Sequence, residues 1–408
     1  MTSNKKLSVC IIGGGNAAHA LAALLPFKGY EKTSMFCPFQ DEAERINAGI
    51  VEQDGYIIAD FASKNTPSGI VKGKPTLVSK DPSDVISDAD VLMMPLPSFA
   101  YSATLKAIKP YLRDGHILCV TPAQGGFDWF ANAILGTDLM SKIVVLGLMP
   151  MPFNCRITSF GKHVHVQALK KHYSIGVLPS TAYSQCEALV KEMFGGSVKA
   201  AGRGTFLECS MFPMNAVIHP SRLHTMLGSW KEGEVLDENP LFYEGFTPEA
   251  AQCVDGVSKE LVRIGKGLTD KGVEVYIPRI FDWSACYLYE WSRESNLLDF
   301  YQNNDAYKGF RCPLVRGTAK DGKEGFVPDF KNRYFTEDIP LGLCLYKGLA
   351  DIAEVQTPFI DTIILHFQSY LGKEYLVNGK LEGKDVAETS APQRFGMTTI
   401  SDLQKLYC

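Results

Sequence analysis

Residues 9–22, VCIIGGGNAAHALA, constrain the fold of this chain more than any other segment. A short apolar run, three glycines and an alanine-rich pattern predict a buried strand, a tight turn and a helix. The spacing Gly13-x-Gly15-x-x-Ala18 is the dinucleotide-binding fingerprint. Gly13 permits the turn, Gly15 lets backbone amides approach a pyrophosphate, and Ala18 lets the helix pack closely on the strand. We therefore predict a nucleotide site at the positive end of the helix dipole, in preference to an ordinary strand–turn–helix.

The composition is typical of a soluble globular protein with room for two domains. Of the 408 residues, 46% are hydrophobic and 21% are charged. The net charge of −4 gives no electrostatic reason to expect a nucleic acid or a membrane surface as partner. The longest apolar stretch, residues 143–153, contains two prolines and is too short to span a bilayer. The 11 cysteines are scattered without a C-x-x-C pair, which favours reduced thiols and a cytoplasmic location.

Strand and helix patterns alternate over the first 150 residues, which predicts a doubly wound α/β fold with a parallel sheet. Strands are expected at residues 32–36, 91–94, 116–120 and 143–148, and helices at 41–48, from 81 and at 99–108. The Asp54-Gly55 pair between extended segments predicts a hairpin insertion. Ligands of open α/β sheets bind beyond the carboxyl ends of the strands, so the loops at Pro97-Ser98, 121–126 and 150–155 are candidate sites.

Long amphipathic segments dominate from about residue 206, at residues 247–269, 279–298 and 341–371. They predict a mainly α-helical second domain. We expect an N-terminal Rossmann-like domain over residues 1–204 and a helical substrate domain over residues 205–408.

The residues after the predicted second strand leave the choice between NAD and NADP open. An NAD site has an acid about 20 residues past the glycines, which holds the ribose hydroxyls. Here residues 36–39 are FCPF, and the first acids, Asp41 and Glu42, come slightly late. Asp41 can still reach the ribose, whereas Arg45 can meet a 2′-phosphate or stack on adenine. Alternatively, residues 41–45 are a solvated helix start whose acids the dipole favours.

His219 is the histidine best placed for proton transfer. It ends an apolar run, residues 215–218, and directly precedes Pro220. A histidine titrates near neutral pH and can match hydride transfer to a carbonyl or imine with proton movement. The alternative is a core histidine that is hydrogen-bonded to a carbonyl.

A second cluster is NRYFTEDIP, residues 332–340. The guanidinium of Arg333 matches a carboxylate with two parallel hydrogen bonds. Asp338 can hold a histidine in one tautomer and stabilise its charged form. Thr336 and Glu337 are interpreted more simply, as caps of a helix that begins near Pro340.

The remaining histidines carry no predicted chemistry. His163 and His165 lie two apart on a predicted strand and point the same way, but no third ligand stands out. We predict a surface pair and no metal site. His19 is expected to pack within the nucleotide turn.

Together these segments resemble the octopine dehydrogenase family, the opine dehydrogenases of marine invertebrates. The resemblance covers essentially the whole chain. It is densest at residues 13–16, 41–45, 155–157, 219–220, 328–330, 332–340, 372–377, 383–387 and 392–394.

The resemblance implies a Rossmann domain, a helical domain and an active site in the cleft between them. The implied reaction joins pyruvate reductively to the amino group of an amino acid with NADH, reversibly, and serves cytosolic redox balance in anaerobic glycolysis. His219 matches the family's catalytic histidine, Asp338 its carboxylate partner and Arg333 the arginine that holds the keto-acid carboxylate. Gln124 and Cys155 match the pyruvate pocket, and Trp283 matches an aromatic residue near the amino-acid substrate.

The family's use of NADH favours NAD, with Arg45 on the adenosine side. The cofactor-binding residues expected on this basis are Gly13, Gly15, Asn16, Ala17, Asp41, Arg45 and Pro97. The expected partners are small molecules only, and a monomer is expected because nothing in the sequence requires an oligomer.

The chain departs from the family pattern near the expected amine site. The resemblance implies methionine and tyrosine, in the arginine-using enzyme, where this chain has Pro213 and Asn215, and a threonine beside pyruvate where it has Pro150. A long guanidinium side chain would need acidic or aromatic contacts there. We therefore expect a smaller amine bound near Asn215, either alanine or glycine first and then taurine or β-alanine, as in alanopine, strombine or tauropine dehydrogenases.

Two other functions stay open at this point. A 2- or 3-hydroxy-acid dehydrogenase would work without an amine partner. A protein that only senses NADH would bind it without turnover.

Overall fold

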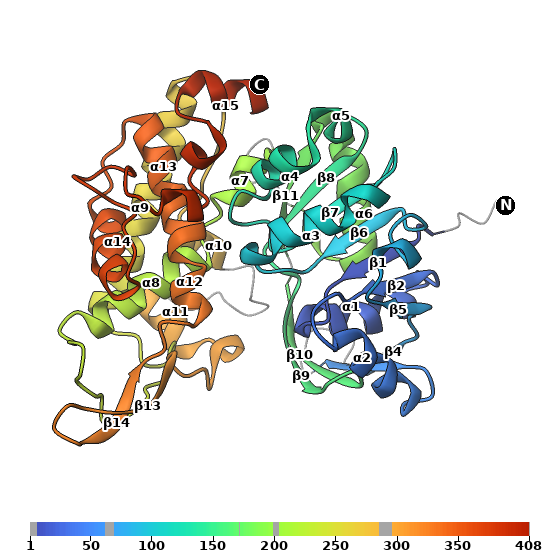
Figure 1. Cartoon of the computed structure of the whole chain (residues 1–408), viewed down its shortest axis with the longest axis horizontal. Helices are drawn as coiled ribbons and strands as arrows, with labels where there is room; N and C mark the ends of the chain where they lie inside the picture. Colours follow the sequence, from blue (N-terminus) through green and yellow to red (C-terminus); the bar gives the residue numbers. More distant parts are fainter. Residues whose placement is uncertain (1–5, 62–68, 171, 199–203, 285–295, 408) are drawn as a thin grey trace. The chain divides into compact units, whose positions relative to one another are not determined.

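The computed structural model describes residues 6–61, 69–170, 172–198, 204–284 and 296–407. Contacts divide the chain into a first compact unit that ends at Ser210 and a second that begins at Met211 (Figure 1). The domain division predicted after residue 204 stays a prediction.

The first unit contains, among the described residues, an eight-stranded sheet. Its strands in spatial order are β12 (Ser197–Val198), β11 (His172–Leu178), β8 (Val144–Met149), β7 (Ile117–Val120), β6 (Val91–Met94), β1 (Val9–Ile12), β2 (Thr33–Phe36) and β5 (Leu77–Ser79). The strands from β8 to β5 run parallel, and β11 is antiparallel to β8. Every residue of β1, β6 and β7 is buried, as in a sheet covered on both faces. The predicted doubly wound α/β fold is confirmed.

Helices follow the strands as the alternating pattern predicts. They are α1 (Asn16–Phe27), α2 (Glu42–Val51), α3 (Tyr101–Ile108), α4 (Phe127–Leu135), α5 (Thr137–Met140), α6 (Tyr183–Phe194) and α7 (Phe206–Ser210), with 3-10 turns η1 (Pro82–Asp84), η2 (Ser98–Ala100), η3 (Lys109–Tyr111) and η4 (Ser180–Ala182). The helix expected from residue 81 is only the turn η1, which the Asp81 carboxylate caps by accepting the Ser83 N–H at 2.9 Å. Helix α7 packs on the sheet, since a Cβ on Gly147 or Gly176 would lie within 2.8 Å of Phe206.

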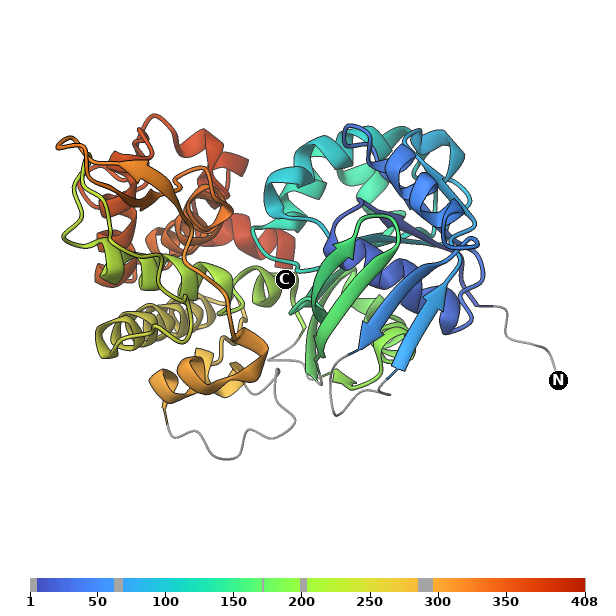
Figure 2. The same ribbon diagram turned by 90° about the horizontal axis from the view of Figure 1, so that it is seen from below.

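A second sheet of four strands in the described part of this unit covers α1. Its order is β4 (Gly69–Gly73), β3 (Ile57–Phe61), β10 (His163–Leu169) and β9 (Phe153–Ser159), and the strands lie side by side in Figure 2. The hairpin predicted at Asp54-Gly55 is wrong. Because α2 continues to Val51, these residues, both with positive φ, turn the chain from helix to strand, and β3 pairs antiparallel with β4.

The second unit is mainly helical, as predicted. Its described elements are α8 (Asn215–Leu227), α9 (Pro248–Asp270), α10 (Ile280–Ser284), α11 (Leu297–Asn303), α12 (Arg333–Thr336), α13 (Cys344–Ala353), α14 (Pro358–Tyr370) and α15 (Ile400–Tyr407), the hairpin β13 (Leu314–Thr318) and β14 (Glu324–Pro328), the π-helix η7 (Ile339–Leu343), and the turns η6 (Asp305–Tyr307), η8 (Val386–Glu388) and η9 (Pro392–Phe395). The amphipathic segment 341–371 is divided at Glu354, where φ is +60°. Within the described ranges, no helix combines the length and the apolar character that crossing a membrane requires.

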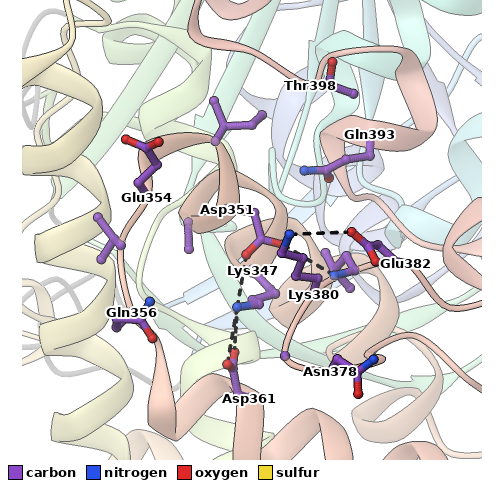
Figure 3. Close-up of a pocket in the computed structure, with 15 residues that line it drawn as sticks. Lys347, Asp351, Glu354, Gln356, Asp361, Asn378, Lys380, Glu382, Gln393 and Thr398 are labelled. Atoms are coloured by element: carbon purple, nitrogen blue, oxygen red, sulfur yellow. Dashed lines mark hydrogen bonds and ion pairs between the residues drawn. The ribbon is translucent and has the colours of Figure 1, made fainter.

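Buried charges tie the helices of the second unit together. The Glu260 side chain on α9 is fully buried and accepts the first N–H groups of α14, from Phe359 at 2.9 Å and Ile360 at 3.0 Å. Lys347 on α13 is also buried, and its Nζ lies 3.1 Å from Asp351 and 3.2 Å from Asp361 on α14 (Figure 3). Lys347, Asp351 and Asp361 line a pocket of about 590 Å³, and their ion pairs join α13 to α14.

Replacing Lys347 by methionine should destabilise the fold, because Asp351 and Asp361 would lose their common cation. We expect the free energy of unfolding, measured by urea denaturation, to fall by about 2–4 kcal/mol. Lys380→Met is the matched control, since Lys380 lines the same pocket but is largely exposed and lies 3.9 Å from Glu382. The control should cost less than about 0.5 kcal/mol. Equal losses in the two variants would contradict a special role for Lys347.

Candidate active site

His219 lies in the first half of α8, which continues through Pro220 to Leu227. Because Pro220 lies beyond the first turn and has no N–H, α8 lacks the backbone hydrogen bond to the carbonyl four residues earlier. The imidazole is 5% exposed. A buried histidine needs polar partners for its ring nitrogens, and the structure provides one on each side.

Asp338 holds the first of these nitrogens. Its Oδ2 lies 2.7 Å from His219 Nδ1, and the Asp338 side chain is almost fully buried. Asp338 directly precedes η7, and a Cβ on Gly342 within η7 would lie 2.4 Å from the Cβ of Ala216 on α8. The glycine therefore permits the close approach that brings the carboxylate to the imidazole. Since a carboxylate accepts from Nδ1–H, Nε2 is the nitrogen left for proton transfer.

Tyr334 covers the face of the same imidazole. The Asn332 side chain caps α12 by accepting the Tyr334 N–H at 3.1 Å. The Tyr334 ring then stacks on His219 with 3.7 Å between ring centroids and 18° between planes. Stacking and the Asp338 hydrogen bond together determine the position and tilt of the imidazole.

Arg333 belongs to the same turn and is held by Glu337. One guanidinium nitrogen lies 3.0 Å from Glu337 Oε2, and about half of the Arg333 side chain remains exposed. Burial opposes its charge, but the carboxylates of Glu337 and Asp338 outweigh burial and raise the pKa of Arg333. The capping role predicted for Glu337 is wrong, because its buried carboxylate pairs with Arg333. The arrangement provides a fixed, exposed cation for a substrate carboxylate.

Tyr243 is the partner of the second nitrogen of His219. Its hydroxyl lies 3.3 Å from Nε2, and its side chain is buried. Nothing in the sequence around residue 243 distinguishes this tyrosine from a core aromatic residue, so it was not predicted. Only the packing of distant segments places it beside the histidine.

The glycine turn of the first unit fits a dinucleotide. Gly13 has φ +107° and donates its N–H to Phe36 O at 2.8 Å, as the predicted tight turn requires. Among the described residues outside its chain neighbours, no heavy atom lies within 4 Å of the position that a Gly15 Cβ would take. Helix α1 begins directly afterwards, and its first amides have no carbonyl partner within the helix, which suits an anion such as a pyrophosphate.

Two further predicted cofactor residues lie in the first turn of α1. Asn16 Oδ1 accepts the Ile157 N–H at 2.8 Å, which ties β9 to the helix start. Ala17 is half-buried beside it. The predicted packing role of His19 agrees with the structure, since the ring is buried and its Nε2 accepts the Gly161 N–H at 2.9 Å.

Glu42, at the start of α2, lies against the glycine turn. Its carboxylate accepts the Gly14 N–H, and its Oε2 would lie 2.8 Å from a Cβ on that glycine. Burial raises the pKa of Glu42, and the Gly14 hydrogen bond opposes this effect. Asp41 is instead exposed and lies 3.7 Å from Arg45, whose guanidinium covers the Phe160 ring at 4.1 Å. Glu42 therefore lies directly at the glycine turn, while contact of Asp41 with the ribose stays a prediction.

The other predicted residues are divided between the units. In the first unit, Pro97 follows β6, Gln124 lies in the loop after β7, and Cys155 is buried in β9. Burial raises the pKa of Cys155 to about 12, so its thiol stays protonated. In the second unit, Asn215 lies one helical turn before His219 and on the same face of α8. The Trp283 side chain lies outside the described residues.

Three comparisons relate this geometry to known proteins. The family model for the α-helical domain of NAD/NADP octopine/nopaline dehydrogenase matches residues 202–371. Tauropine dehydrogenase of Arabella iricolor is 34% identical over 97% of this chain and 99% of its own length. The structure of octopine dehydrogenase with NADH and L-arginine is 31% identical, covers 97% of both chains and superposes with a TM-score of 0.82. The structure of that enzyme with NADH and pyruvate has a TM-score of 0.80 over 98% of both chains.

Alanine substitutions at Gly13 and Gly15, the two outer glycines of the turn, should affect stability and NADH binding differently. Gly15→Ala should leave the free energy of unfolding within about 0.5 kcal/mol of the parent, because its Cβ points into open space. NADH binding, followed by fluorescence titration, should weaken at least about tenfold because the Cβ would separate the amides from the pyrophosphate. Gly13→Ala is the counterpart and should cost about 1–3 kcal/mol of stability through its positive φ. Unchanged NADH affinity in Gly15→Ala would reject the turn as the binding site.

Proposed function

The chain belongs to the octopine dehydrogenase family of opine dehydrogenases, and we propose on this premise that it joins pyruvate reductively to the amino group of a small amino acid. It is an NADH-dependent oxidoreductase acting on CH–NH bonds. Pyruvate and the amine lose water to form an imine, and the imine takes up a hydride and a proton to become an opine. The reverse reaction oxidises the opine.

The observation that carries this proposal is the convergence of three side chains in the second unit. His219 and Asp338 share a 2.7 Å hydrogen bond, and Arg333 lies one residue from the ring that stacks on that histidine. A proton carrier beside an exposed guanidinium suits a keto acid, because the guanidinium binds the carboxylate while the histidine faces the neighbouring carbon's oxygen.

Arg333 orients the substrate in this proposal. A carboxylate bound by two parallel hydrogen bonds cannot rotate, so one face of the adjacent carbon is presented to the hydride donor. Positioning of this kind contributes several kcal/mol to catalysis (about 7–11 at most). Gln124 and Cys155 are the further residues proposed to contact pyruvate, as the family resemblance implies.

His219 moves the proton. In opine formation Nε2–H donates to the oxygen that leaves as water, and the protonated imine then takes up the hydride. In the reverse direction the opine loses a hydride to become the protonated imine, and neutral Nε2 accepts a proton from the water that attacks it. Asp338 stabilises the charged imidazole in both cases and keeps the reacting nitrogen in place. The buried environment strengthens this interaction.

The first unit is proposed to bind the cofactor through Gly13, Gly15, Asn16 and Ala17, with Pro97 beside it. When bound, NADH supplies the hydride. The open space at Gly15 and the start of α1 support this placement. Glu42 would lie close to the ribose and disfavour a 2′-phosphate by charge repulsion, while Asp41 and Arg45 contact the adenosine side.

The amine is proposed to be small and to bind near Asn215 and Trp283. Asn215 has a short side chain one turn from His219, and its amide can hydrogen-bond an amino-acid carboxylate or a sulfonate. We favour alanine or glycine, with taurine or β-alanine next. The likeness to tauropine and octopine dehydrogenases supports the class of reaction and leaves the amine to experiment.

We also propose a cellular location, an oligomeric state and domain bounds for this protein. All nine cysteines among the described residues are buried free thiols, which supports a cytoplasmic protein. There the reaction would regenerate NAD during anaerobic glycolysis. We propose a monomer whose cofactor domain spans residues 1–204 and whose substrate domain spans residues 205–408.

An assay of NADH oxidation tests the proposed reaction. We expect oxidation with pyruvate only when an amine is added, and the highest kcat/KM with alanine or glycine in a panel that includes taurine, β-alanine and arginine. His219→Ala should lower kcat by about 10²–10⁴-fold and leave NADH affinity near that of the parent. Oxidation without an amine would indicate a hydroxy-acid dehydrogenase, and arginine as the best substrate would refute a small amine site.

Glu337→Gln should weaken pyruvate binding specifically. The amide is the same size but cannot neutralise Arg333, so the guanidinium loses the partner that fixes it. We expect the KM for pyruvate to rise about 5–20-fold with a smaller change in kcat, measured at saturating NADH and amine. Glu232→Gln, at an exposed position, is the control and should match the parent. A pure loss of kcat with unchanged KM would argue against this role.

A further inference from the structure

The hydroxyl of Tyr243 lies at the nitrogen of His219 that the proposed reaction uses. Asp338 occupies Nδ1 at 2.7 Å, and Tyr243 Oη lies 3.3 Å from Nε2. The imidazole is therefore held at both nitrogens by groups from two distant parts of the second unit. Of the two, only the tyrosine contacts the nitrogen that exchanges a proton with substrate.

The packing around Tyr243 prevents its hydroxyl from moving freely. The ring stacks on Tyr307 with 4.1 Å between centroids and 16° between planes, and it packs on Tyr301 at 5.9 Å. Phe242, the preceding residue, is hydrogen-bonded to another segment, because it donates its N–H to Phe310 O. Phe242 also meets the imidazole edge-on at 5.4 Å. A hydroxyl fixed in this way can determine the direction of a hydrogen bond.

We propose that Tyr243 is a positioning residue that tunes His219 for proton transfer. The inference rests on the proposed function and deepens it. A phenol hydroxyl donates to neutral Nε2 and accepts from Nε2–H, so His219 stays hydrogen-bonded in both protonation states. The bond from the charged imidazole is the stronger of the two, because hydrogen bonds with an ionised partner exceed neutral ones. Tyr243 thus favours the proton-loaded form of His219.

This role predicts the direction in which the pH dependence of the enzyme's activity changes when the hydroxyl is removed. Without the hydroxyl, the charged imidazole loses more than the neutral one, and His219 gives up its proton at lower pH. Opine formation needs the charged form of His219, so the alkaline limb of the pH–rate profile of opine formation should move to lower pH. Opine oxidation needs the neutral form, so its acidic limb should also move to lower pH. Packing alone predicts no such paired shift.

Other ionisable groups near His219 remain in place when the hydroxyl is removed. Asp338 lies at Nδ1, Tyr334 stacks on the ring, and Arg333 and Glu337 lie beside Tyr334 at the start and just past the end of α12. The surrounding elements also carry ionisable side chains, namely Tyr346 on α13, Arg222 on α8, Cys253 on α9 and His366 on α14. The parent and a variant that lacks only the Tyr243 hydroxyl both contain all of these groups. A difference between their pH profiles therefore reports the effect of that hydroxyl.

Tyr243→Phe tests the proposal, since it keeps the stacked ring and removes only the hydroxyl. We expect both pH limbs to move down by about 0.5–1 unit, and kcat at the optimum to fall about 3–10-fold, with the KM for pyruvate nearly unchanged. Tyr307→Phe is the matched control. It removes a hydroxyl from the ring stacked on Tyr243, leaves the Tyr243–His219 hydrogen bond, and should keep the parent's limbs.

A second measurement separates this proposal from the proposed function. The His219 ring is titrated by NMR in the full-length chain, and its signal is assigned by comparison with His219→Gln. Its midpoint should move to lower pH in Tyr243→Phe and stay in Tyr307→Phe, whether or not the chain makes opines. Identical titrations in the parent and in Tyr243→Phe would overturn the role of Tyr243. A shifted titration without amine-dependent NADH oxidation would instead refute the proposed reaction.

Discussion

The hydrogen bond between Asp338 and His219 is the interaction around which the second unit is arranged. It joins residues 119 positions apart in the chain and lies in a buried environment. Neither side chain is stable there alone, because removing one partner of a buried pair costs about 3–5 kcal/mol. The bond forms only because η7 approaches α8 closely at Gly342, where any side chain would collide with Ala216.

Two adjacent carboxylates have different partners in this arrangement. Glu337 pairs with Arg333, one turn earlier, and Asp338 reaches His219 on another helix. Each negative charge is matched by a basic group, so the like charges of neighbouring residues can both be buried. The result is a cation with an exposed side and a histidine with a defined reacting nitrogen, which are the two elements that binding and protonating a keto acid require.

The two units contribute different kinds of groups. The first presents backbone amides, which the absence of a side chain at Gly15 leaves accessible, while the second presents ionisable side chains. The strand pattern and the glycine spacing made the first contribution predictable, because both depend on residues close in sequence. The hairpin at Asp54-Gly55 was mistaken since local turn chemistry does not reveal that the preceding residues are helical.

The sequence by itself determined the alternation of strands and helices, the glycine turn, and the residue types His219, Arg333 and Asp338 that the chemistry requires. Motif and family resemblance were sufficient for these, because they reside in short contiguous segments. The tertiary structure decided which groups lie beside these residues: Glu337 pairs with Arg333 rather than capping a helix, Glu42 lies at the glycine turn, and Tyr243 lies at Nε2 of His219. The Tyr243–His219 contact depends on how segments 24 residues apart pack, which no local pattern of residues encodes. Glu337 and Arg333 are only four residues apart, but the burial of Glu337, which makes Arg333 its partner, comes from the tertiary structure.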